Sequence, residues 1–326
     1  MFTIDFHNHF YPPEYLEELE TGNSNVKVTY DSNNNPLLHY PGDYNILVPE
    51  HRDITYRAEI LENSGINMQI VSLTTPGVHI ESPTRAVQLA RLVNESFAKI
   101  MNEYRERFSA LATLPLNDPS ASVTELEYTF KDLGFRGVML FSNVNGTALS
   151  DSQFIPLYER ADELQAVFYV HPNYPAGVEA MTDYWLMPLI GFPFDTTLTA
   201  AKIVFSGIAK KFPRIRWVFA HLGGAIPYLA ERLDRGYYAF KECRENIEKP
   251  PSEYLKTFYY DTVNFDTKAL QFAIDFAGTE HLLAGSDYPH QIGSLKKMIE
   301  SINQLQITQK EKAKIYGGNV KKLLNL

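Results

Sequence analysis

The stretch Thr3-Ile4-Asp5-Phe6-His7-Asn8-His9 decides the fold, because an apolar run typical of a buried strand ends in two histidines two positions apart. Side chains alternate between the two faces of a strand, so His7 and His9 point the same way and can bind one cation. A single His-x-His pair is weak evidence for a metal site. The evidence for a metal site becomes strong if residues able to bind a metal also follow other strands.

Three further apolar runs with the pattern of strands also end in a residue able to bind a metal. These residues are His171, after residues 166–170; His221, after residues 215–220; and Asp287, after residues 282–286. Together with His7 and His9 they place ligand candidates at the C-terminal ends of four separate strands. We therefore predict a site assembled from across the chain.

Length, composition and charge narrow the class of protein. With 326 residues, of which 44% are hydrophobic and 13% aromatic, the chain can bury a large core as one α/β barrel or as two smaller domains. A net charge of −9 argues against nucleic acid as a partner, and no apolar run is long enough to span a membrane. The first residues lack a signal-peptide pattern, so we expect a cytoplasmic protein. The only cysteine, Cys243, excludes a thiolate metal site.

Eight short apolar runs alternate with helical patterns along the chain. The expected strands are residues 3–6, 68–73, 108–114, 137–141, 166–170, 216–220, 258–263 and 282–285. The expected helices are residues 54–63, 83–107, 121–133, 153–164, 198–212, 226–242, 267–276 and 294–305. Continuous apolar runs of this length are typical of parallel strands buried on both faces.

Eight strand–helix units predict an α/β fold of the (β/α)8 TIM-barrel type, with the active site at the C-terminal ends of the strands. A doubly wound sheet is the alternative, but its ligand candidates would have to converge from the far edges of an open sheet. Closing the sheet places the first and last strands side by side, and with them His7, His9 and Asp287. We expect one barrel domain over residues 1–326.

Two segments go beyond a minimal barrel. Residues 10–50 contain alternating runs at 26–30 and 37–40 with turn residues between them, which predicts a small hairpin insertion after the first strand. Residues 176–197 form an apolar and aromatic loop after the fifth strand. Such a loop is either a lid over the core or a subunit interface.

Several motifs along the chain form a recognisable set. They include Asp5-Phe6-His7-Asn8-His9-Phe10, Val170-His171-Pro172, Phe219-Ala220-His221-Leu222-Gly223-Gly224-Ala225 and Gly285-Ser286-Asp287-Tyr288-Pro289. By these motifs the chain resembles the amidohydrolase superfamily, and within it the aminocarboxymuconate-semialdehyde decarboxylase-like group, which also contains the γ-resorcylate and carboxyvanillate decarboxylases.

The resemblance implies a set of site residues. It makes His7, His9, His171 and Asp287 the ligands of one divalent metal, with Zn²⁺ expected and Mn²⁺ as the alternative. It makes His221 a catalytic residue beside the metal, and it matches Arg232 to an arginine that binds a substrate carboxylate.

The chemistry of these residue types agrees with that assignment. Neutral imidazoles and a carboxylate suit zinc, and four protein ligands leave a position for a water or a substrate oxygen. Binuclear relatives use a carboxylated lysine at the end of strand four, where this chain has Ser142 and Asn143, so one metal is expected. In a nonoxidative decarboxylation, His221 or Asp287 would manage the proton that replaces CO2. No organic cofactor is needed when the substrate itself accepts the electrons.

Other histidines and arginines receive separate interpretations. We expect His290 and Trp185 to contact the substrate. We expect His39 and His51 to lie at the surface. For His79 two places stay open, one at the barrel mouth and one without a functional role. By the resemblance, Val48 stands where aminocarboxymuconate decarboxylases have a substrate-binding arginine. The candidate to replace that arginine is Arg52.

Three functions follow in order of preference. The first is a metal-dependent, nonoxidative decarboxylase of a small unsaturated or aromatic carboxylic acid. The second is a hydrolase or hydratase that uses a metal-activated water on a related substrate, and release of CO2 without addition of water separates the two. The third is a noncatalytic protein with a structural metal, but structural zinc sites are compact, and these ligands come from distant strands.

The apolar segment 184–194 predicts self-association. It contains Trp185 and several other large apolar residues that burial against a second copy would remove from water. We therefore expect a homodimer or a dimer of dimers. Because resembling enzymes complete the substrate site with an arginine from the neighbouring subunit, Arg235 is the candidate to act across the interface.

Overall fold

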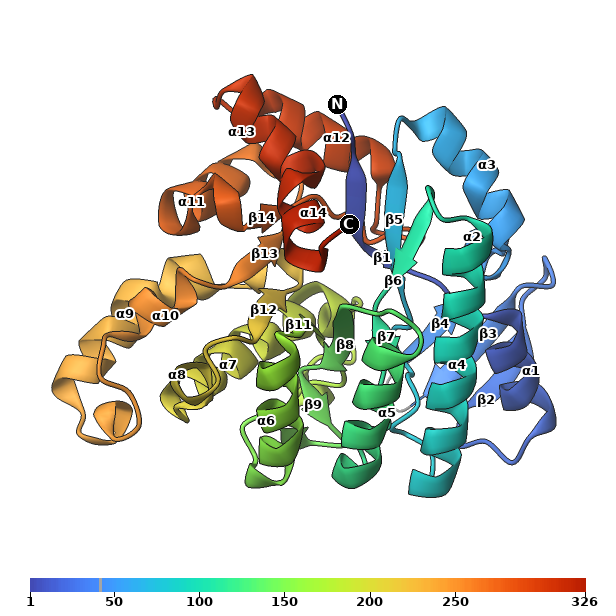
Figure 1. Ribbon diagram of the computed structural model, residues 1–326, viewed down its shortest axis with the longest axis horizontal. Coiled ribbons are helices and arrows are strands. Elements are labelled where there is room, and N and C mark those ends of the chain that lie inside the picture. Colours follow the sequence, from blue (N-terminus) through green and yellow to red (C-terminus); the bar gives the residue numbers. More distant parts are fainter. Residues whose placement is uncertain (41–42) are drawn as a thin grey trace.

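The computed structural model describes residues 1–40 and 43–326. Its central strands are parallel and follow the order of the chain (Figure 1). They are β1 (Ile4–His9), β5 (Met68–Ser72), β6 (Phe108–Ala110), β7 (Ala112–Thr113), β8 (Gly137–Phe141), β11 (Val167–His171), β12 (Arg216–Phe219), β13 (Tyr259–Asp261) and β14 (Leu282–Leu283). Strands β6 and β7 are the two halves of one predicted strand, separated by Leu111.

Main-chain hydrogen bonds close the barrel between its first and last strands. The amide of Phe6 donates to the carbonyl of Ala284 at 2.8 Å, and the amide of Asp287 donates to the carbonyl of His7 at 2.8 Å. The closed barrel predicted from the sequence is therefore confirmed. The closure also carries Asp287 to the end of β1.

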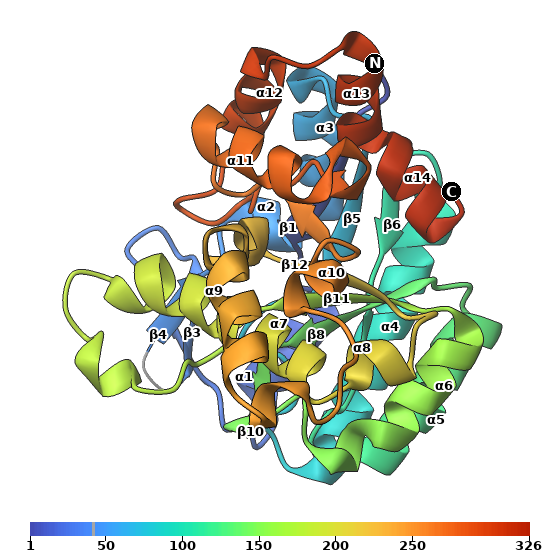
Figure 2. The ribbon, with the colours of Figure 1, turned by 90° about the vertical axis from the view of Figure 1, so that its left-hand side faces the viewer.

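Helices surround the strands on the outside, as Figures 1 and 2 show from two sides. They are α3 (Ile54–Ser64), α4 (Pro83–Glu103), α5 (Pro119–Lys131), α6 (Ile155–Leu164), α7 (Phe192–Phe205), α8 (Ile208–Lys211), α9 (Ile226–Ala239), α10 (Pro251–Leu255), α11 (Thr267–Ala277), α12 (Leu295–Gln304) and α13 (Gln309–Ala313). Local chemistry starts several of them: the Asp118 side chain accepts from the amide of Ala121 at 2.9 Å at the start of α5. No helix in the described ranges is long and apolar enough to cross a membrane.

One predicted helix was wrong in its bounds. The helix expected over residues 198–212 starts earlier, at Phe192, with Pro193 in its first turn, where the missing amide hydrogen has no consequence. It then breaks at Gly207, which has a φ of 81°, a conformation that favours glycine. Part of the segment expected to be a loop is therefore helical.

The insertion after β1 is larger than a hairpin. The predicted pair is present as β2 (Lys27–Tyr30) and β3 (Pro36–Tyr40), which are antiparallel, and β4 (Asp43–Ile46) adds a third strand. Helix α1 (Pro13–Thr21) precedes the sheet and lies beside α4, and the short helix α2 (Pro49–Arg52) follows it (Figure 1).

Apolar side chains fill the barrel interior below the ligand residues. Phe6 and Tyr169 meet edge to face there, with ring centroids 5.1 Å apart. The C-terminal helix α14 (Asn319–Leu324) adds Val320 and Leu323 to the same buried cluster. The ligand-bearing strand ends therefore stand on a packed core that does not depend on them.

Candidate metal centre and active site

Four buried side chains converge at the C-terminal ends of the barrel strands. They are His7 and His9 on β1, His171 at the end of β11, and Asp287 after β14, and their ligand atoms all lie within 4.8 Å of one another. The Nε2 atoms of His7 and His9 are 3.1 Å apart, and Asp287 Oδ1 is 3.2 Å from each. The structure thus brings together the four residues predicted to bind the metal.

The outer ring nitrogens fix which histidine atoms face the centre. His7 Nδ1 lies 2.7 Å from Asp261 Oδ2, and His171 Nδ1 lies 2.9 Å from the Pro172 carbonyl oxygen. With Nδ1 donating outward, the Nε2 of each ring, once neutral, presents a lone pair inward. This arrangement is the usual support for a metal-bound histidine.

The charges of the centre favour a cation. Burial lowers the pKa of His9 and His171 well below the usual value, so both rings are neutral. Burial opposes protonation of His7 as well, but Asp261 and Asp287 outweigh it and raise the pKa of His7 to about 10. Within the described chain, Asp287 Oδ1 is buried without a hydrogen-bond donor. A divalent ion fits this set of donors, since it would supply the positive charge that the two carboxylates attract.

Asp261, at the end of β13, is a site residue that the sequence reasoning missed. Its two carboxylate oxygens accept hydrogen bonds of 2.7 to 3.3 Å from donors on His7, Tyr169, His221, Leu222 and Val263. Burial alone would raise its pKa, but His7 outweighs burial and lowers it. Asp261 therefore orients a ligand ring and the backbone at His221 together.

Asp261→Asn should weaken metal binding by about 10- to 100-fold, the usual effect of removing a carboxylate behind a ligand histidine. The amide NH2 would have to face one of the donors that the carboxylate now accepts. Competition with a chelating indicator measures the affinity, and Asp275→Asn, on the exposed side of α11, serves as the matched control. Equal affinity in the two variants would contradict the assigned role of Asp261.

His221 lies beside the four ligand residues at the end of β12. Its Nε2 is 3.9 Å from Asp287 Oδ2, and its ring centroid is 5.0 Å from that of His7. Its Nδ1 has no hydrogen-bond partner among the described residues, and burial lowers its pKa. A neutral ring with a free nitrogen beside the centre can accept or donate a proton.

The backbone is left-handed at two of these functional positions, with φ angles of 54° at His221 and 57° at Asp287. Leu222, which follows His221, has a φ of 57° as well. Such angles are uncommon for residues other than glycine. The chain therefore places the His221 and Asp287 side chains through turns that these residue types do not prefer.

A cavity of about 580 Å³ opens over the centre and is bounded by His171, His221 and Asp287. Trp185 and His290 line it, and their predicted contact with a substrate stays a prediction. Its remaining walls are largely apolar and aromatic, and no lysine or arginine within residues 1–40 and 43–326 lines it.

His51 was expected at the surface, and that prediction was wrong. The side chain is buried and lines the cavity, because α2 folds back onto the end of β1, where the amide of Tyr11 donates to the His51 carbonyl at 2.8 Å. Its ring centroid is 5.2 Å from that of His290, which in turn is 4.8 Å from His9. The two histidines therefore extend one wall of the cavity outward from the metal centre.

The predicted arginines lie elsewhere in the single chain. Arg232 and Arg235 are exposed on α9. Arg52 does not line the cavity in the described structure, and its Nε donates to the Leu47 carbonyl at 3.2 Å. None of the three contacts the metal centre. The substrate roles of Arg232 and Arg235 remain predictions, and that of Arg235 depends on a second copy.

Arg57 is a second supporting residue that the sequence reasoning missed. Its guanidinium is fully buried and donates to the His9 carbonyl at 2.9 Å and to Asn8 Oδ1 at 2.9 Å. It also donates to the Glu50 carbonyl at 2.7 Å. Arg57 thus ties α2 to the end of the strand that carries the ligand pair.

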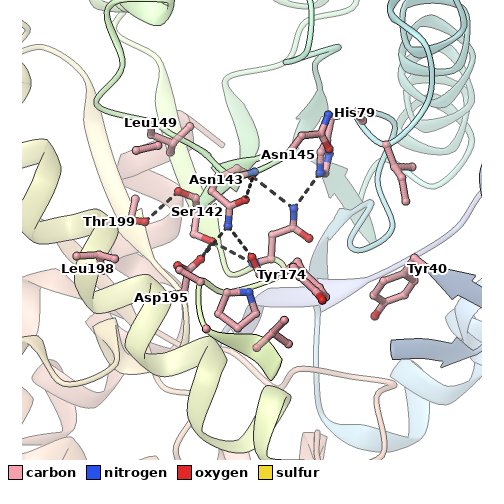
Figure 3. A pocket seen from close by; sticks show the side chains of 18 of the residues that line it. Tyr40, His79, Ser142, Asn143, Asn145, Leu149, Tyr174, Asp195, Leu198 and Thr199 are labelled. Atoms are coloured by element: carbon pink, nitrogen blue, oxygen red, sulfur yellow. Dashed lines mark hydrogen bonds between the residues drawn. The ribbon is translucent and has the colours of Figure 1, made fainter. Parts of the chain in front are cut away.

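A neighbouring cavity of about 400 Å³ contains His79, whose place the sequence left open (Figure 3). Its polar groups bond to one another: Asn173 Nδ2 lies 2.9 Å from His79 Nε2, and Asn143 Nδ2 donates to Asp195 at 3.2 Å. Ser142, at the end of strand β8, also donates to Asp195. Binuclear relatives have a lysine at the end of this strand. In this chain Ser142 and Asn143 stand there, and both hydrogen-bond to Asp195.

The barrel, the buried His3Asp set and the adjoining histidine define a metal-dependent enzyme of the TIM-barrel class. The family model described as amidohydrolase matches residues 4–326, and the chain belongs to that family.

Relatives of known activity narrow the reaction. The chain is 32% identical over 279 residues to a 2-amino-3-carboxymuconate-6-semialdehyde decarboxylase of Dictyostelium discoideum, with 84% of this chain and 77% of the relative covered. A dihydroxybenzoic acid decarboxylase from Polaromonas, solved with manganese and the inhibitor 2-nitroresorcinol, aligns with a TM-score of 0.83 at 25% identity, over 100% of this chain and 97% of that one. The protein is thus an amidohydrolase-superfamily enzyme of the carboxy-lyase kind.

A third comparison supports the fold alone. A 5-carboxyvanillate decarboxylase from Sphingomonas paucimobilis aligns with a TM-score of 0.88 at 24% identity, over 100% of this chain and 99% of that one.

Proposed function

We propose that the protein catalyses the metal-dependent, nonoxidative decarboxylation of a small aromatic or unsaturated carboxylic acid. The observation that carries the proposal is His221 beside a His3Asp centre, at the base of a largely apolar cavity. Apolar and aromatic walls suit a planar ring or a conjugated chain, and the similarity to decarboxylases of such acids gives further support.

His7, His9, His171 and Asp287 would hold the metal. When bound, a divalent ion supplies a Lewis acid that polarises a substrate oxygen and stabilises negative charge developing there. His221, neutral in the free protein, takes up a proton from solvent and delivers it to the ring or chain carbon as the bond from that carbon to the carboxylate breaks. One C–H bond replaces one C–C bond, CO2 leaves, and His221 returns to its neutral form. Trp185 and His290 bound the volume in which the substrate lies.

The test is a product assay with a panel of hydroxybenzoic and muconate-type acids. Decarboxylation in D2O should release CO2 and place one deuterium on the carbon that lost it. The alternative reaction, hydrolysis or hydration by a metal-activated water, would retain the carboxylate carbon in the product and add the elements of water. A product of that kind, without CO2, would overturn the proposal.

We further propose Zn²⁺ as the native metal, with Mn²⁺ as the alternative. Imidazole-rich sites favour zinc, whereas the Polaromonas enzyme was solved with manganese. Elemental analysis of protein purified without added metal, followed by reconstitution of the chelated protein with each ion, separates the two.

The working unit in this proposal is a dimer or a dimer of dimers. Tyr184 and Trp185 have exposed fractions of 87% and 52%, and Phe194 has 57%. The neighbouring helix α9 adds Tyr228 and Tyr238, both exposed. Burial of these side chains against a second copy would remove apolar surface from water. It would also bring Arg232 and Arg235 on α9 into an interface.

Mixing two inactive variants tests a site shared between protomers. If Arg235 completes the partner's cavity, His221→Asn and Arg235→Ala protomers should together form mixed dimers with one intact site. For random exchange in a twofold dimer we expect about a quarter of wild-type activity. Each variant alone is the control. A mixture as inactive as its components, or a fully active monomer in light scattering, would refute the shared site.

A further inference from the structure

His51 is built into the cavity wall by its backbone and leaves its ring without a protein partner. Its amide donates to the Val48 carbonyl at 2.9 Å, and its carbonyl accepts from the amide of Tyr11 at 2.8 Å. The side chain is 1% exposed, yet among the described residues neither Nδ1 nor Nε2 has a hydrogen-bond partner.

Such an orphaned imidazole is costly in a folded core. A buried polar group without a partner loses its hydrogen bonds to water and gains none in return, so most buried polar groups are hydrogen-bonded. His51 lines the cavity over the metal centre, and its ring lies tilted against that of His290, with centroids 5.2 Å apart and an interplanar angle of 53°. We therefore expect the hydrogen-bond partner of the His51 ring to be part of the molecule that binds in the cavity.

The surroundings define the chemistry of that partner. A neutral imidazole offers one donor and one acceptor, which match a hydroxyl group. The cavity walls hold no lysine or arginine within the described ranges, so the chain itself offers no cation to a second carboxylate. The His290 ring contacts both the His9 ring and the His51 ring. A hydroxyl group bound to His51 would therefore lie on the side of the metal centre where His9 and His290 are.

We propose that His51, supported by His290, binds an uncharged hydroxyl substituent of the substrate and so selects hydroxylated over unsubstituted ring positions. The inference rests on the proposed decarboxylase function and names its substrate class more closely: an aromatic monocarboxylic acid with a hydroxyl group facing the two histidines.

Binding measurements with ring isomers test the contact without reliance on turnover. The metal-loaded protein is titrated by calorimetry with 2-hydroxybenzoate and with the 2,3-, 2,4-, 2,5- and 2,6-dihydroxybenzoates. At least one added hydroxyl should tighten binding by about tenfold, the effect of one hydrogen bond. In His51→Phe, which keeps the ring packing but has no polar atoms, that preference should fall to within about twofold.

Thermal stability separates a ligand contact from a structural role. Removing an unpartnered imidazole should leave the Tm of the ligand-free protein unchanged or higher. The matched control is His281→Phe, at the opposite end of the barrel, where His281 Nδ1 has a partner 3.0 Å away in the Phe258 carbonyl. That variant should lose stability and keep the wild-type preference among the benzoates.

The outcomes distinguish this inference from the proposed function. If benzoates bind to the wild type but His51→Phe keeps the full preference, or lowers the Tm as His281→Phe does, the hydroxyl contact is refuted. If the metal-loaded wild type binds none of the benzoates, the aromatic substrate class fails as well. Loss of the preference with a retained Tm supports the contact.

Discussion

His171→Ala loses the metal and turnover and keeps a cooperative thermal transition: this is the result we expect from the placement of the ligand. His171 ends β11 above an apolar cluster to which its side chain does not belong. Turnover should fall by more than about a hundredfold, the upper range for losing a residue that merely supports a ligand.

Elemental analysis, a steady-state assay and a melting curve are the measurements. His39→Ala, in the insertion strand β3 and bonded to Thr29, removes a histidine outside the centre and should keep metal and activity. Chelation of the wild type should reproduce the folded, inactive state. Full metal occupancy and turnover in His171→Ala would remove it from the ligand set, and unfolding on chelation would favour a structural metal.

His221→Asn is expected to retain most of the metal and to lose turnover by about 100- to 10,000-fold, the range of a general acid–base contribution. The choice of asparagine matters because the backbone there has a φ of 54°, and asparagine accepts this conformation better than most residues. The substitution therefore removes the titrating ring and preserves the turn.

The pH profile gives the His221 variant a second readout. A histidine that transfers the proton should impose a pH dependence on kcat that disappears in His221→Asn, whereas a residue that only shapes the turn should leave the profile unchanged. Metal content must be measured in the same samples. Near-normal turnover would exclude His221 as the proton donor.

The ends of the barrel strands could be predicted because these strands are buried on both faces and so appear in the sequence as continuous apolar runs. Apolar runs of strand length ended in His7, His171, His221 and Asp287, and the barrel rule placed those ends on one face. Asp261 obeys the same rule after Tyr259 and Tyr260. The sequence did not single it out because the predicted strand ran to residue 263 and so placed Asp261 inside it, whereas β13 ends at Asp261.

The burial of His51 and Arg57 could not be read from local sequence. The segment around α2 is polar and has the composition of a surface turn, and α3 has weak amphipathic character. Their burial depends on how residues 10–50 fold back over the end of β1, which is a long-range event. The third insertion strand, β4, follows from the same packing, because its pairing with β3 gives a short polar segment its hydrogen bonds.

The left-handed turns at His221 and Asp287 have a consequence for how this protein could change over time. A non-glycine residue in that conformation costs about 1–2 kcal/mol, which is a large fraction of the net stability of a domain. Selection for folding alone would favour glycine at both positions, as the chain already has at Gly223 and Gly224. In a descendant that no longer needed the reaction, replacing His221 and Asp287 by glycine would therefore stabilise the fold. The barrel would be kept and the catalytic activity would be lost.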